Sequence, residues 1–377
     1  MESNRVKKNR RNEISYFDYS LLFITVFIIC FGLVMLYSAS SYEASMTFGD
    51  SKHYLTRQVI FVIAGAVVAF FVVKIDYHLY KKPLIAFLIY LGSIIIAGLV
   101  ITPFGVEANG AKRWLGFGNF SLQVCEVVKV GVIIYMAYAI DRFGRNVKKL
   151  KLFVRCVFYT FGPVAVIALV TKDLSSSIVI AAIGMIMLFI ACPKISYFFA
   201  IAGMGVLGFV GMVLIEPFRI ERFKVWLNPE KYSDEGGYQI LQSLYSLGSG
   251  GIFGKGLGKG VQKLGYVPEA QNDMIFTVVC EELGVVGGIA VILMFIFMIW
   301  RFMVVANNAP DLFGSLIVIG VMAHISVQSI MNIAVVTNSM PNTGVTLPFL
   351  SYGGTSIFFL IIEVALVLSV SKRIKVE

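Results

Sequence analysis

Ten long apolar stretches constrain the fold of this chain more than any other feature. Each has about 18 residues or more, the length that a helix needs to cross roughly 30 Å of hydrocarbon. Hydrophobic residues fill 58% of the 377 positions, more than in a water-soluble domain. We therefore expect an all-α, polytopic membrane protein with about ten transmembrane helices, at residues 16–40, 54–74, 83–102, 122–140, 152–170, 174–192, 196–216, 273–300, 312–337 and 350–370.

The distribution of Lys and Arg predicts which side of the membrane each loop faces, because short cytoplasmic loops carry an excess of positive charge. With the N-terminus inside, the inner segments hold 18 Lys and Arg residues and the short outer segments hold four. Both termini are therefore expected in the cytoplasm. Loop orientation and anionic lipid headgroups account for the formal net charge of +10, so we expect no nucleic-acid partner.

This topology divides the chain into five segments. Two short ends are expected in the cytoplasm, and one large loop is expected outside. The segments are a basic N-terminus (1–15), seven spans (16–216), the large extracytoplasmic loop (217–272), three spans (273–370) and a tail (371–377).

The large loop is the only long hydrophilic connection, and such loops are usually functional or disordered. This loop keeps aromatic and aliphatic residues throughout, which favours an ordered structure. Its segment 238–248 predicts a short amphipathic helix lying along the membrane interface. The apolar face of that helix is expected to carry Ile240, Leu241, Leu244 and Tyr245.

A glycine-rich segment, GSGGIFGKGLGKG at 248–260, follows this helix. It lacks the spacing of a phosphate-binding P-loop and of a dinucleotide-binding GxGxxG motif. Two interpretations stay open. It is either a tight loop packed on the helices, or a loop that contacts a phosphorylated ligand through backbone N–H groups and lysines. Lys255, Lys259 and the nearby Lys263 are the candidates for that contact.

The first outer connection, 103–121, holds Arg113 beside Trp114, and the next span opens with Glu126 and Lys129. Trp114 suits either the aromatic belt at a membrane interface or a binding site. Glu126 and Lys129 lie three residues apart on a helix and can form an ion pair. An ion pair within a span faces a cavity or the bundle interior, so a structural role and a substrate contact both remain open.

Two aspartates precede outer helix ends. Asp173 in TKDLSSS suits a helix N-cap. Asp273 in VPEAQNDMIF suits either an N-cap, shared with Asn272, or a functional site. On a helix, Asp273, Thr277 and Glu281 share one face, and a polar stripe at that depth predicts a hydrated cavity open to the outside. A carboxylate at its mouth suits proton abstraction from a hydroxyl.

The last outer connection, 338–356, reads NSMPNTGVTLPFLSYGGTS. Its prolines and glycines predict an ordered turn, which either packs against the helices or lines the same cavity. Ser351 is its candidate contact with substrate.

Several long blocks resemble the SEDS family (shape, elongation, division and sporulation), in the same order and spacing. They are GLVMLYSASS, NGAKRWLGFGNFSLQVCEVVK, the block 236–284 and MPNTGVTLPFLSYGGTS. The first of these is closer to the FtsW and SpoVE branch than to RodA. Three motifs depart from the usual pattern but keep the acid: QVCE for QPSE, TKDLS for QPDLG and QNDM for HTDF.

The resemblance implies a peptidoglycan glycosyltransferase of the bacterial cytoplasmic membrane, active in division or sporulation. It implies lipid II as substrate, polymerised at the outer face, and a class B penicillin-binding protein transpeptidase as partner. Asp273 is implied to be the general base for the acceptor's 4-hydroxyl, with undecaprenyl pyrophosphate as leaving group. Lys and Arg residues, or a divalent cation (Mg or Mn), would neutralise that group. The residues implied to line the substrate cavity or support it are Arg113, Trp114, Glu126, Lys129, Asp173, Glu269 and the PFLSYGG turn with Ser351.

Two other functions compete with polymerisation. A lipid II flippase would use the same substrate, but transporters often show broken helices in two repeat halves, and the sequence shows no internal repeat. A scaffold that recruits the transpeptidase would need no catalytic aspartate.

Overall fold

Long helices make up most of the protein, whose computed structural model describes residues 14–108, 111–118, 120–192, 194–215, 217–233 and 237–376. Three single-turn helices, η1 (Tyr77–Lys81), η2 (Leu99–Ile101) and η3 (Gly144–Lys148), link some of them. The α-helices are α1 (Tyr19–Phe48), α2 (His53–Lys74), α3 (Pro83–Gly98), α4 (Val124–Phe143), α5 (Leu150–Val170), α6 (Leu174–Ala191), α7 (Ile195–Ile215), α8 (Pro217–Leu227), α9 (Tyr238–Ser249), α10 (Ile275–Asn307), α11 (Leu312–Val336) and α12 (Gly354–Ser371).

All ten predicted spans coincide with helices, namely α1 to α7 and α10 to α12. Within the described residues, eight helices are long and apolar enough to cross a membrane. α4 and α7 fall outside these eight. α4 carries charged side chains at both ends, among them Glu126, Lys129 and Asp141, and several side chains of α7 lie outside the described residues. α1 and α10 extend beyond the predicted limits, to Phe48 and Asn307. The all-α, multi-pass prediction is confirmed.

Local sequence signals explain where several helices begin. Asp18, Asp173 and Asp311 each accept a hydrogen bond from a backbone N–H in the first turn of α1, α6 and α11. This bond satisfies a donor that the helix leaves without a partner. α3 begins with Pro83, whose missing N–H costs nothing at that position.

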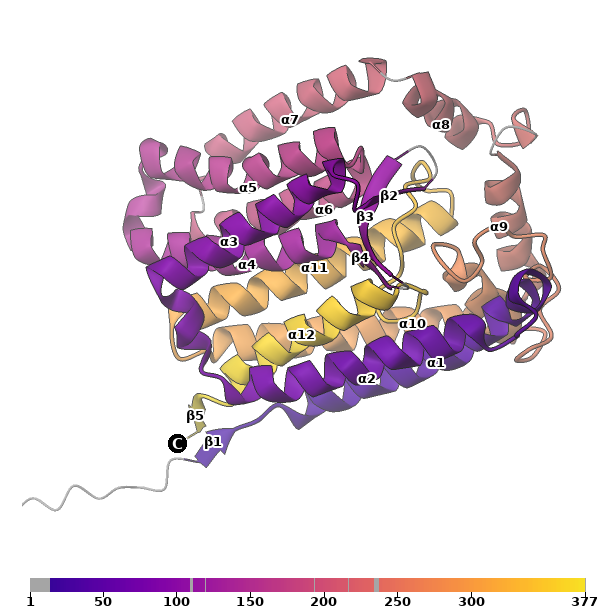
Figure 1. The fold of residues 1–377 in the computed structure, drawn as a ribbon, viewed down its shortest axis with the longest axis horizontal. Helices are drawn as coiled ribbons and strands as arrows, with labels where there is room; N and C mark the ends of the chain where they lie inside the picture. Colours follow the sequence, from indigo (N-terminus) through magenta and orange to yellow (C-terminus); the bar gives the residue numbers. More distant parts are fainter. Residues whose placement is uncertain are drawn as a thin grey trace, which may run out of the picture.

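A small antiparallel sheet in the first outer connection was not predicted. β2 (Gly105–Ala108), β3 (Ala111–Phe117) and β4 (Phe120–Gln123) pair in the order β2-β3-β4. In this register Trp114 of β3 pairs with both Val106 and Gln123. Because β4 runs directly into α4, this pairing holds β3, with Arg113 and Trp114, near the start of α4. Figure 1 shows the sheet at that end of the helices.

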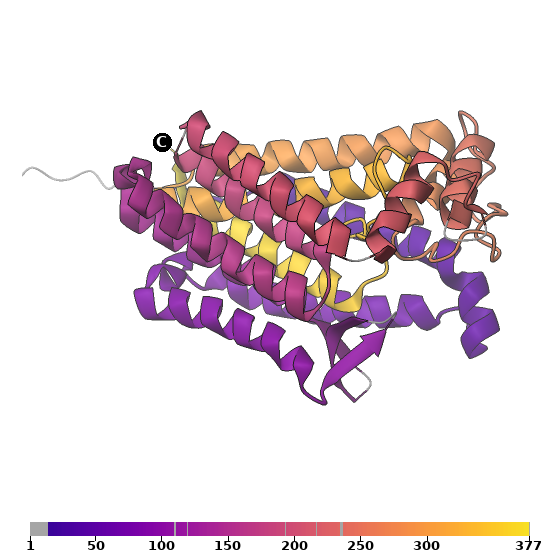
Figure 2. The same ribbon diagram turned by 90° about the horizontal axis from the view of Figure 1, so that it is seen from above.

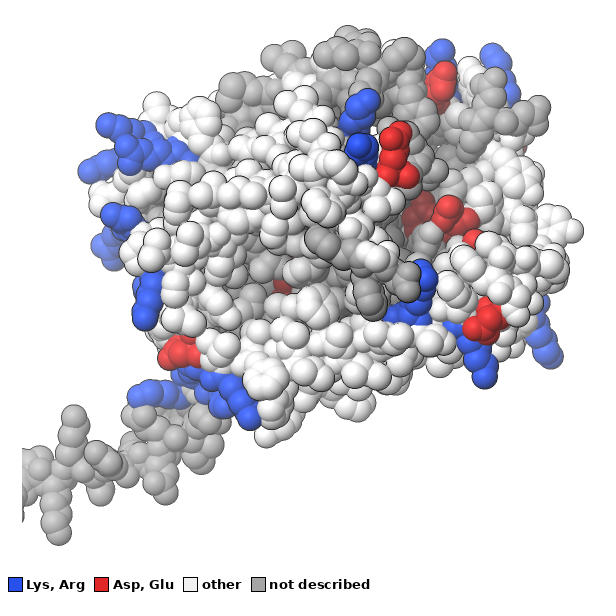
Figure 3. Space-filling model, viewed as in Figure 1, with Lys and Arg blue, Asp and Glu red and all other residues white. Residues whose placement is uncertain are grey.

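The helices run along one direction, and the outer connections gather at one end (Figures 1 and 2). That end holds the small sheet, α8, α9 and the loops around them. At the opposite end, β1 (Ile14–Tyr16) pairs with β5 (Ile374–Val376), and Lys and Arg gather around it (Figure 3). Most of the basic segment 1–15 lies outside the described residues, as does Pro193 in the break between the sixth and seventh spans.

The predicted amphipathic helix is present as α9, but its buried face differs from the prediction. Ile240 is buried as expected, whereas Tyr245 is exposed. Ser243 and Ser246 are buried instead. Their hydroxyls donate to the backbone oxygens of Val336 and Thr277, and these bonds let polar side chains face the bundle.

The glycine-rich segment packs tightly against α10, as the first interpretation proposed. α10 is interrupted at Gly284, whose φ of +71° favours glycine. Around this break, the backbone N–H of Lys255 donates to Glu281 O at 3.0 Å, and that of Val285 donates to Gly251 O at 3.0 Å. The loop therefore completes the hydrogen bonding of an interrupted membrane helix.

Candidate active site

A polar cavity of about 610 Å³ lies at the end of the bundle that carries the outer connections. Its walls come from the start of α2, the small sheet, α4, α6, α8, α9, α11, the turn 342–346 and the start of α12. Figure 3 shows acidic atoms inside a hollow between the sheet and the α8–α9 end. The predicted site residues that line this cavity are Arg113, Trp114, Glu126, Lys129, Asp173, Glu269 and Asp273.

Asp273 lies in the turn just before α10 and is 8% exposed. Asn332 Nδ2 donates to its backbone oxygen at 2.7 Å and fixes the turn. Within the described residues, Asp273 Oδ1 has no hydrogen-bond partner. α10 starts at Ile275 after Met274 in the N-cap position, with no side-chain cap. The helix-cap interpretation of Asp273 is therefore wrong, and its carboxylate is available to a ligand.

The surroundings of Asp273 change its proton affinity. Burial, and after it the negative charge of Glu269, raise the pKa of Asp273 to about 7. Arg222 opposes this shift. A carboxyl group with a pKa near the working pH suits general-base catalysis, because it exists unprotonated and still accepts a proton effectively.

Four cationic side chains line the same cavity: Arg57, Arg113, Arg222 and Lys129. Arg222 donates to the backbone oxygen of Asn342 at 3.0 Å. Arg113 Nε is buried and has no hydrogen-bond partner in the described part of the chain. Guanidinium groups present planar pairs of donors that match phosphate oxygens. The cavity can therefore bind an anionic group close to Asp273.

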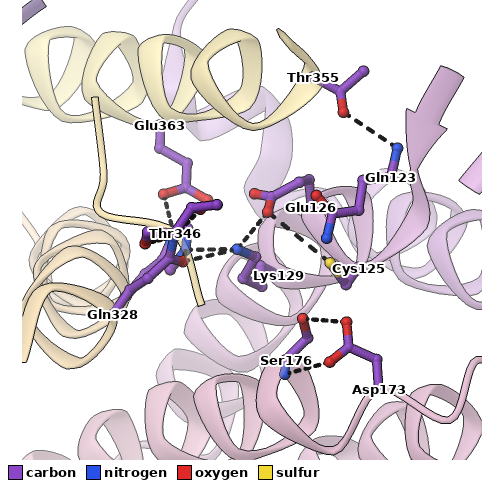
Figure 4. A network of polar contacts seen from close by, with 11 residues as sticks. Gln123, Cys125, Glu126, Lys129, Asp173, Ser176, Gln328, Thr346, Thr355 and Glu363 are labelled. Atoms are coloured by element: carbon purple, nitrogen blue, oxygen red, sulfur yellow. Dashed lines mark hydrogen bonds and ion pairs between the residues drawn. The ribbon is translucent and has the colours of Figure 1, made fainter. Parts of the chain in front are cut away.

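The predicted pair of Glu126 and Lys129 is present, with 2.8 Å between Glu126 Oε1 and Lys129 Nζ (Figure 4). Both side chains are almost fully buried. Gln328 Oε1 of α11 accepts from Lys129 at 3.1 Å, and its Nε2 donates to Thr346 O at 3.0 Å. The pair thus joins α4 to α11 and to the turn at 342–346.

Asp173 caps α6, as predicted. Its Oδ1 accepts from Ser176 N at 3.0 Å and its Oδ2 accepts from Ser176 Oγ at 2.7 Å (Figure 4). Its carboxylate also lines the cavity. Glu269 is exposed at the mouth, has a φ of +55°, and accepts a hydrogen bond from Asn272 Nδ2.

The predicted hydrated stripe below Asp273 is wrong. Thr277 and Glu281 are fully buried and do not line the cavity. Glu281 instead binds the glycine-rich loop: it pairs with Lys255 Nζ at 2.7 Å and accepts from Val261 N at 2.9 Å. Helical spacing placed these residues on one face correctly, but the loop covers that face.

The three loop lysines do not reach the cavity, so we leave them out of the site. Lys255 pairs with Glu281, and Lys263 pairs with Glu282 at 2.6 Å. Lys259 is also absent from the cavity lining. Ser351 is also absent from the cavity lining. Its Oγ accepts a hydrogen bond from Leu347 N at 2.8 Å. Tyr352, the next residue of the same turn, does line the cavity.

The acids of the cavity do not form a metal site. Among the described residues, no three His, Cys, Asp or Glu side chains are close enough together to hold a metal ion. Glu126 is engaged by Lys129 and Asp173 by Ser176. The divalent cation implied by the resemblance stays a prediction, and the reaction proposed for this cavity does not depend on one.

Sequence reasoning missed many polar residues of the cavity, and three of them are instructive. Arg57 follows the start of α2, Arg222 lies in α8 of the large loop, and Gln328 lies within the ninth predicted span. The polar Gln328 in a membrane span was a usable signal. Arg57 offered a similar signal, since it lies in the predicted span 54–74. Arg222 carried no local signal, because only the packing of distant segments brings it to the cavity.

Comparisons with known proteins agree with this architecture. The family model for FtsW, RodA and SpoVE, described as "Cell cycle protein", matches residues 19–376. Stage V sporulation protein E of Bacillus subtilis is 37% identical over 359 residues, which cover 94% of this chain and 97% of that protein. Probable peptidoglycan glycosyltransferase FtsW of Trichlorobacter lovleyi is 36% identical, covering 96% of this chain and 95% of that one.

Two solved structures share the fold. The first is a chain from "Structural coordination of polymerization and crosslinking by a peptidoglycan synthase complex", with a TM-score of 0.78, 24% identity and coverage of 94% and 97%. The second is Rod shape determining protein RodA of Thermus thermophilus, with a TM-score of 0.71, 23% identity and coverage of 96% and 98%. The chain therefore belongs to the FtsW, RodA and SpoVE family, the SEDS family that its motifs resemble.

Proposed function

We propose that this protein is a peptidoglycan glycosyltransferase that polymerises lipid II, with Asp273 as its general base. Family membership and the activity named for the FtsW relatives support this function. The observation that carries it is the buried Asp273 carboxylate, whose Oδ1 has no partner within the described residues, in a cavity lined by arginines. Its raised pKa of about 7 agrees with this role.

The reaction assigns each part of the cavity a role. Asp273 accepts the proton of the acceptor sugar's 4-hydroxyl, and the hydroxyl oxygen attacks the anomeric carbon of the donor. The bond from that carbon to the diphosphate oxygen breaks, and the diphosphate leaves with the electron pair. Arg57, Arg113 and Arg222 stabilise the negative charge that develops on it. The proton on Asp273 then passes to water.

The proposed membrane orientation rests on the charge of the short connections. We place the end that holds the cavity outside, since the short segments predicted inside hold 18 Lys and Arg residues and the short segments predicted outside hold four. Both termini are then cytoplasmic. The structural neighbour comes from a peptidoglycan synthase complex that coordinates polymerisation and crosslinking, which supports a penicillin-binding protein as partner. That this partner is of class B is implied by the motif resemblance. Division or sporulation machinery is the expected context, from the FtsW and SpoVE relatives.

Purified protein, combined with its transpeptidase partner and given fluorescent lipid II, tests this function. The wild type and the control Asp50→Asn, at an exposed site outside the cavity, should form glycan chains. Asp273→Asn should lose at least a hundredfold in rate, because general-base catalysis contributes about 10² to 10⁴. Full-length polymer from Asp273→Asn would disprove the role of Asp273 and favour a scaffold. Movement of lipid II across a bilayer without polymer would favour a flippase.

A further inference from the structure

Behind the cavity wall, a histidine and a glutamate form a fully buried pair. His324 of α11 and Glu363 of α12 are both 0% exposed, with 2.7 Å between His324 Nδ1 and Glu363 Oε2. Neither residue lines the cavity. The pair nevertheless contacts a residue of the cavity lining, because His324 Nε2 lies 2.8 Å from Nζ of Lys129.

The ammonium of Lys129 has as many neighbours as it has protons. Its Nζ lies 2.8 Å from Glu126 Oε1, 2.8 Å from His324 Nε2 and 3.1 Å from Gln328 Oε1. An ammonium group has three N–H donors. When all three point to these atoms, no donor remains for a ligand in the cavity.

The proton on His324 decides whether this arrangement is possible. Neutral His324, with its proton on Nδ1 toward Glu363, leaves a lone pair on Nε2 that accepts from Lys129. Protonated His324 has no such lone pair, and its Nε2–H would donate to Gln328 Oε1, 2.8 Å away. Two cations 2.8 Å apart also repel each other strongly in a buried site. Protonation of His324 and retention of Lys129 therefore exclude each other.

The cluster around Lys129 holds more carboxyl groups than lysines. Lys129 opposes two carboxylates, Glu126 and Glu363, so the cluster with neutral His324 carries a net negative charge in the membrane interior, which is costly. Glu126 Oε2 and Glu363 Oε1 also have no hydrogen-bond partner within the described residues. Histidine is the side chain whose charge ordinarily changes near neutral pH.

The other elements packed on α11 do not compensate this charge. α6 has no ionisable side chain after its cap. Asp273, which contacts Asn332 of α11, is another acid and supplies no positive charge, and other charged groups near α11 are paired elsewhere. Those pairs are Glu281 with Lys255, Glu282 with Lys263, and Asp311 with Lys81.

We propose that His324, held by Glu363, is a positioning residue that controls whether Lys129 binds a phosphate group in the cavity. Neutral His324 holds the ammonium among Glu126, His324 and Gln328, with no N–H left for a ligand. Protonated His324 releases it toward the diphosphate of a lipid-linked substrate or product, and the incoming anion replaces the contact that Lys129 loses. The choice of a lipid diphosphate as ligand rests on the proposed function.

Binding of undecaprenyl diphosphate to the purified full chain, measured between pH 5.5 and 8.5, tests this proposal. The affinity of the wild type should fall with rising pH, because binding is linked to the uptake of one proton. Relative to the affinity of His324→Gln, this fall should approach tenfold per pH unit. Comparison between variants removes the titration of the ligand itself. Glu363→Gln should move the midpoint of the wild-type curve to lower pH, since the carboxylate favours the histidine cation. His78→Gln, an exposed histidine outside the cavity, is the matched control and should keep the full slope.

The same pH dependence in wild type and His324→Gln would overturn the proposal. If His324→Gln does not fold, an unchanged midpoint in Glu363→Gln overturns it instead. The binding assay needs no turnover, so the two proposals fail separately. Polymer without pH-linked binding contradicts only the role of His324, whereas pH-linked binding without polymer contradicts only the glycosyltransferase function.

Discussion

The raised pKa of Asp273 predicts that the polymerisation rate increases with pH through about 7. The carboxylate accepts a proton only in its ionised form. With a pKa of about 7, roughly one tenth of the molecules are ionised at pH 6 and roughly one hundredth at pH 5. The rate at saturating lipid II should therefore fall about tenfold per unit below pH 7. A carboxyl with the ordinary pKa of 3.8 would give a nearly flat profile over the same range.

Two variants shift this profile in opposite directions. Burial is the largest cause of the raised pKa and remains in both variants. Glu269→Gln removes a negative charge and should move the acidic limb to lower pH. Arg222→Gln removes a positive charge and should move it to higher pH. The polymerisation rate of each variant is measured between pH 5.5 and 8.5 with fluorescent lipid II and gel separation of the glycan chains. Asp50→Asn is the control, whose pH profile should match that of the wild type.

The reasoning is refuted if the wild-type rate is constant from pH 5.5 to 8.5. It is refuted equally if the two variants move the limb in the same direction. Saturating substrate is essential, because the proposed release of Lys129 by His324 acts on binding rather than on the chemical step.

Three further predictions concern stability, each measured by thermal unfolding in one detergent. Asp273→Asn should raise Tm at pH 8 and lose this advantage toward pH 5. The carboxyl has a higher pKa in the folded protein, about 7, than in the unfolded chain, about 3.8. Its ionisation therefore lowers the stability of the wild type progressively between about pH 3.8 and 7, and fully above pH 7. A gain that is the same at both pH values would contradict the ionisation argument. Gly284→Ala should lower Tm by an amount equivalent to at least about 1 to 3 kcal/mol. The φ of Gly284 is +71°, and a Cβ at this position would lie 2.3 Å from Ile252 O. Gly92→Ala is the control, because Gly92 has open space around it. Glu282→Gln should lower the free energy of unfolding by about 3 to 5 kcal/mol, because it leaves Lys263 buried without an anion. The KM for lipid II should stay unchanged. A large rise in KM would mean that the loop contacts substrate.

Hydropathy predicted the helices well because the membrane imposes one simple requirement. A segment such as α3 or α12 must bury its backbone polar groups in hydrogen bonds over the full thickness, and only a long apolar helix does so. The sheet β2-β3-β4 was missed for the complementary reason. Its strands are short, and their pairing depends on how the connection folds against α4 and α12 rather than on a local pattern.

The candidate site was predicted in part. Motif resemblance and local charge identified Asp273, Glu126 and Asp173, all of which line the cavity. Periodicity failed at Glu281, because it assigns a residue to a helix face but cannot say which loop covers that face. Lys255 illustrates the same limit: a lysine in a glycine-rich loop suggests a phosphate ligand, and only the structure shows the buried carboxylate that already binds it.

The ion pairs between α10 and the loop segment before it also affect how the chain enters the membrane. Glu281 and Glu282 lie within a membrane helix, where each charged side chain adds up to about 3 kcal/mol to the cost of insertion. Their partners Lys255 and Lys263 precede them in the sequence. In the membrane orientation proposed above, these cations would cross the bilayer during synthesis before the carboxylates arrive. The insertion of α10 would then be coupled to the folding of the preceding loop, and loss of either lysine would impair biogenesis before it affected catalysis.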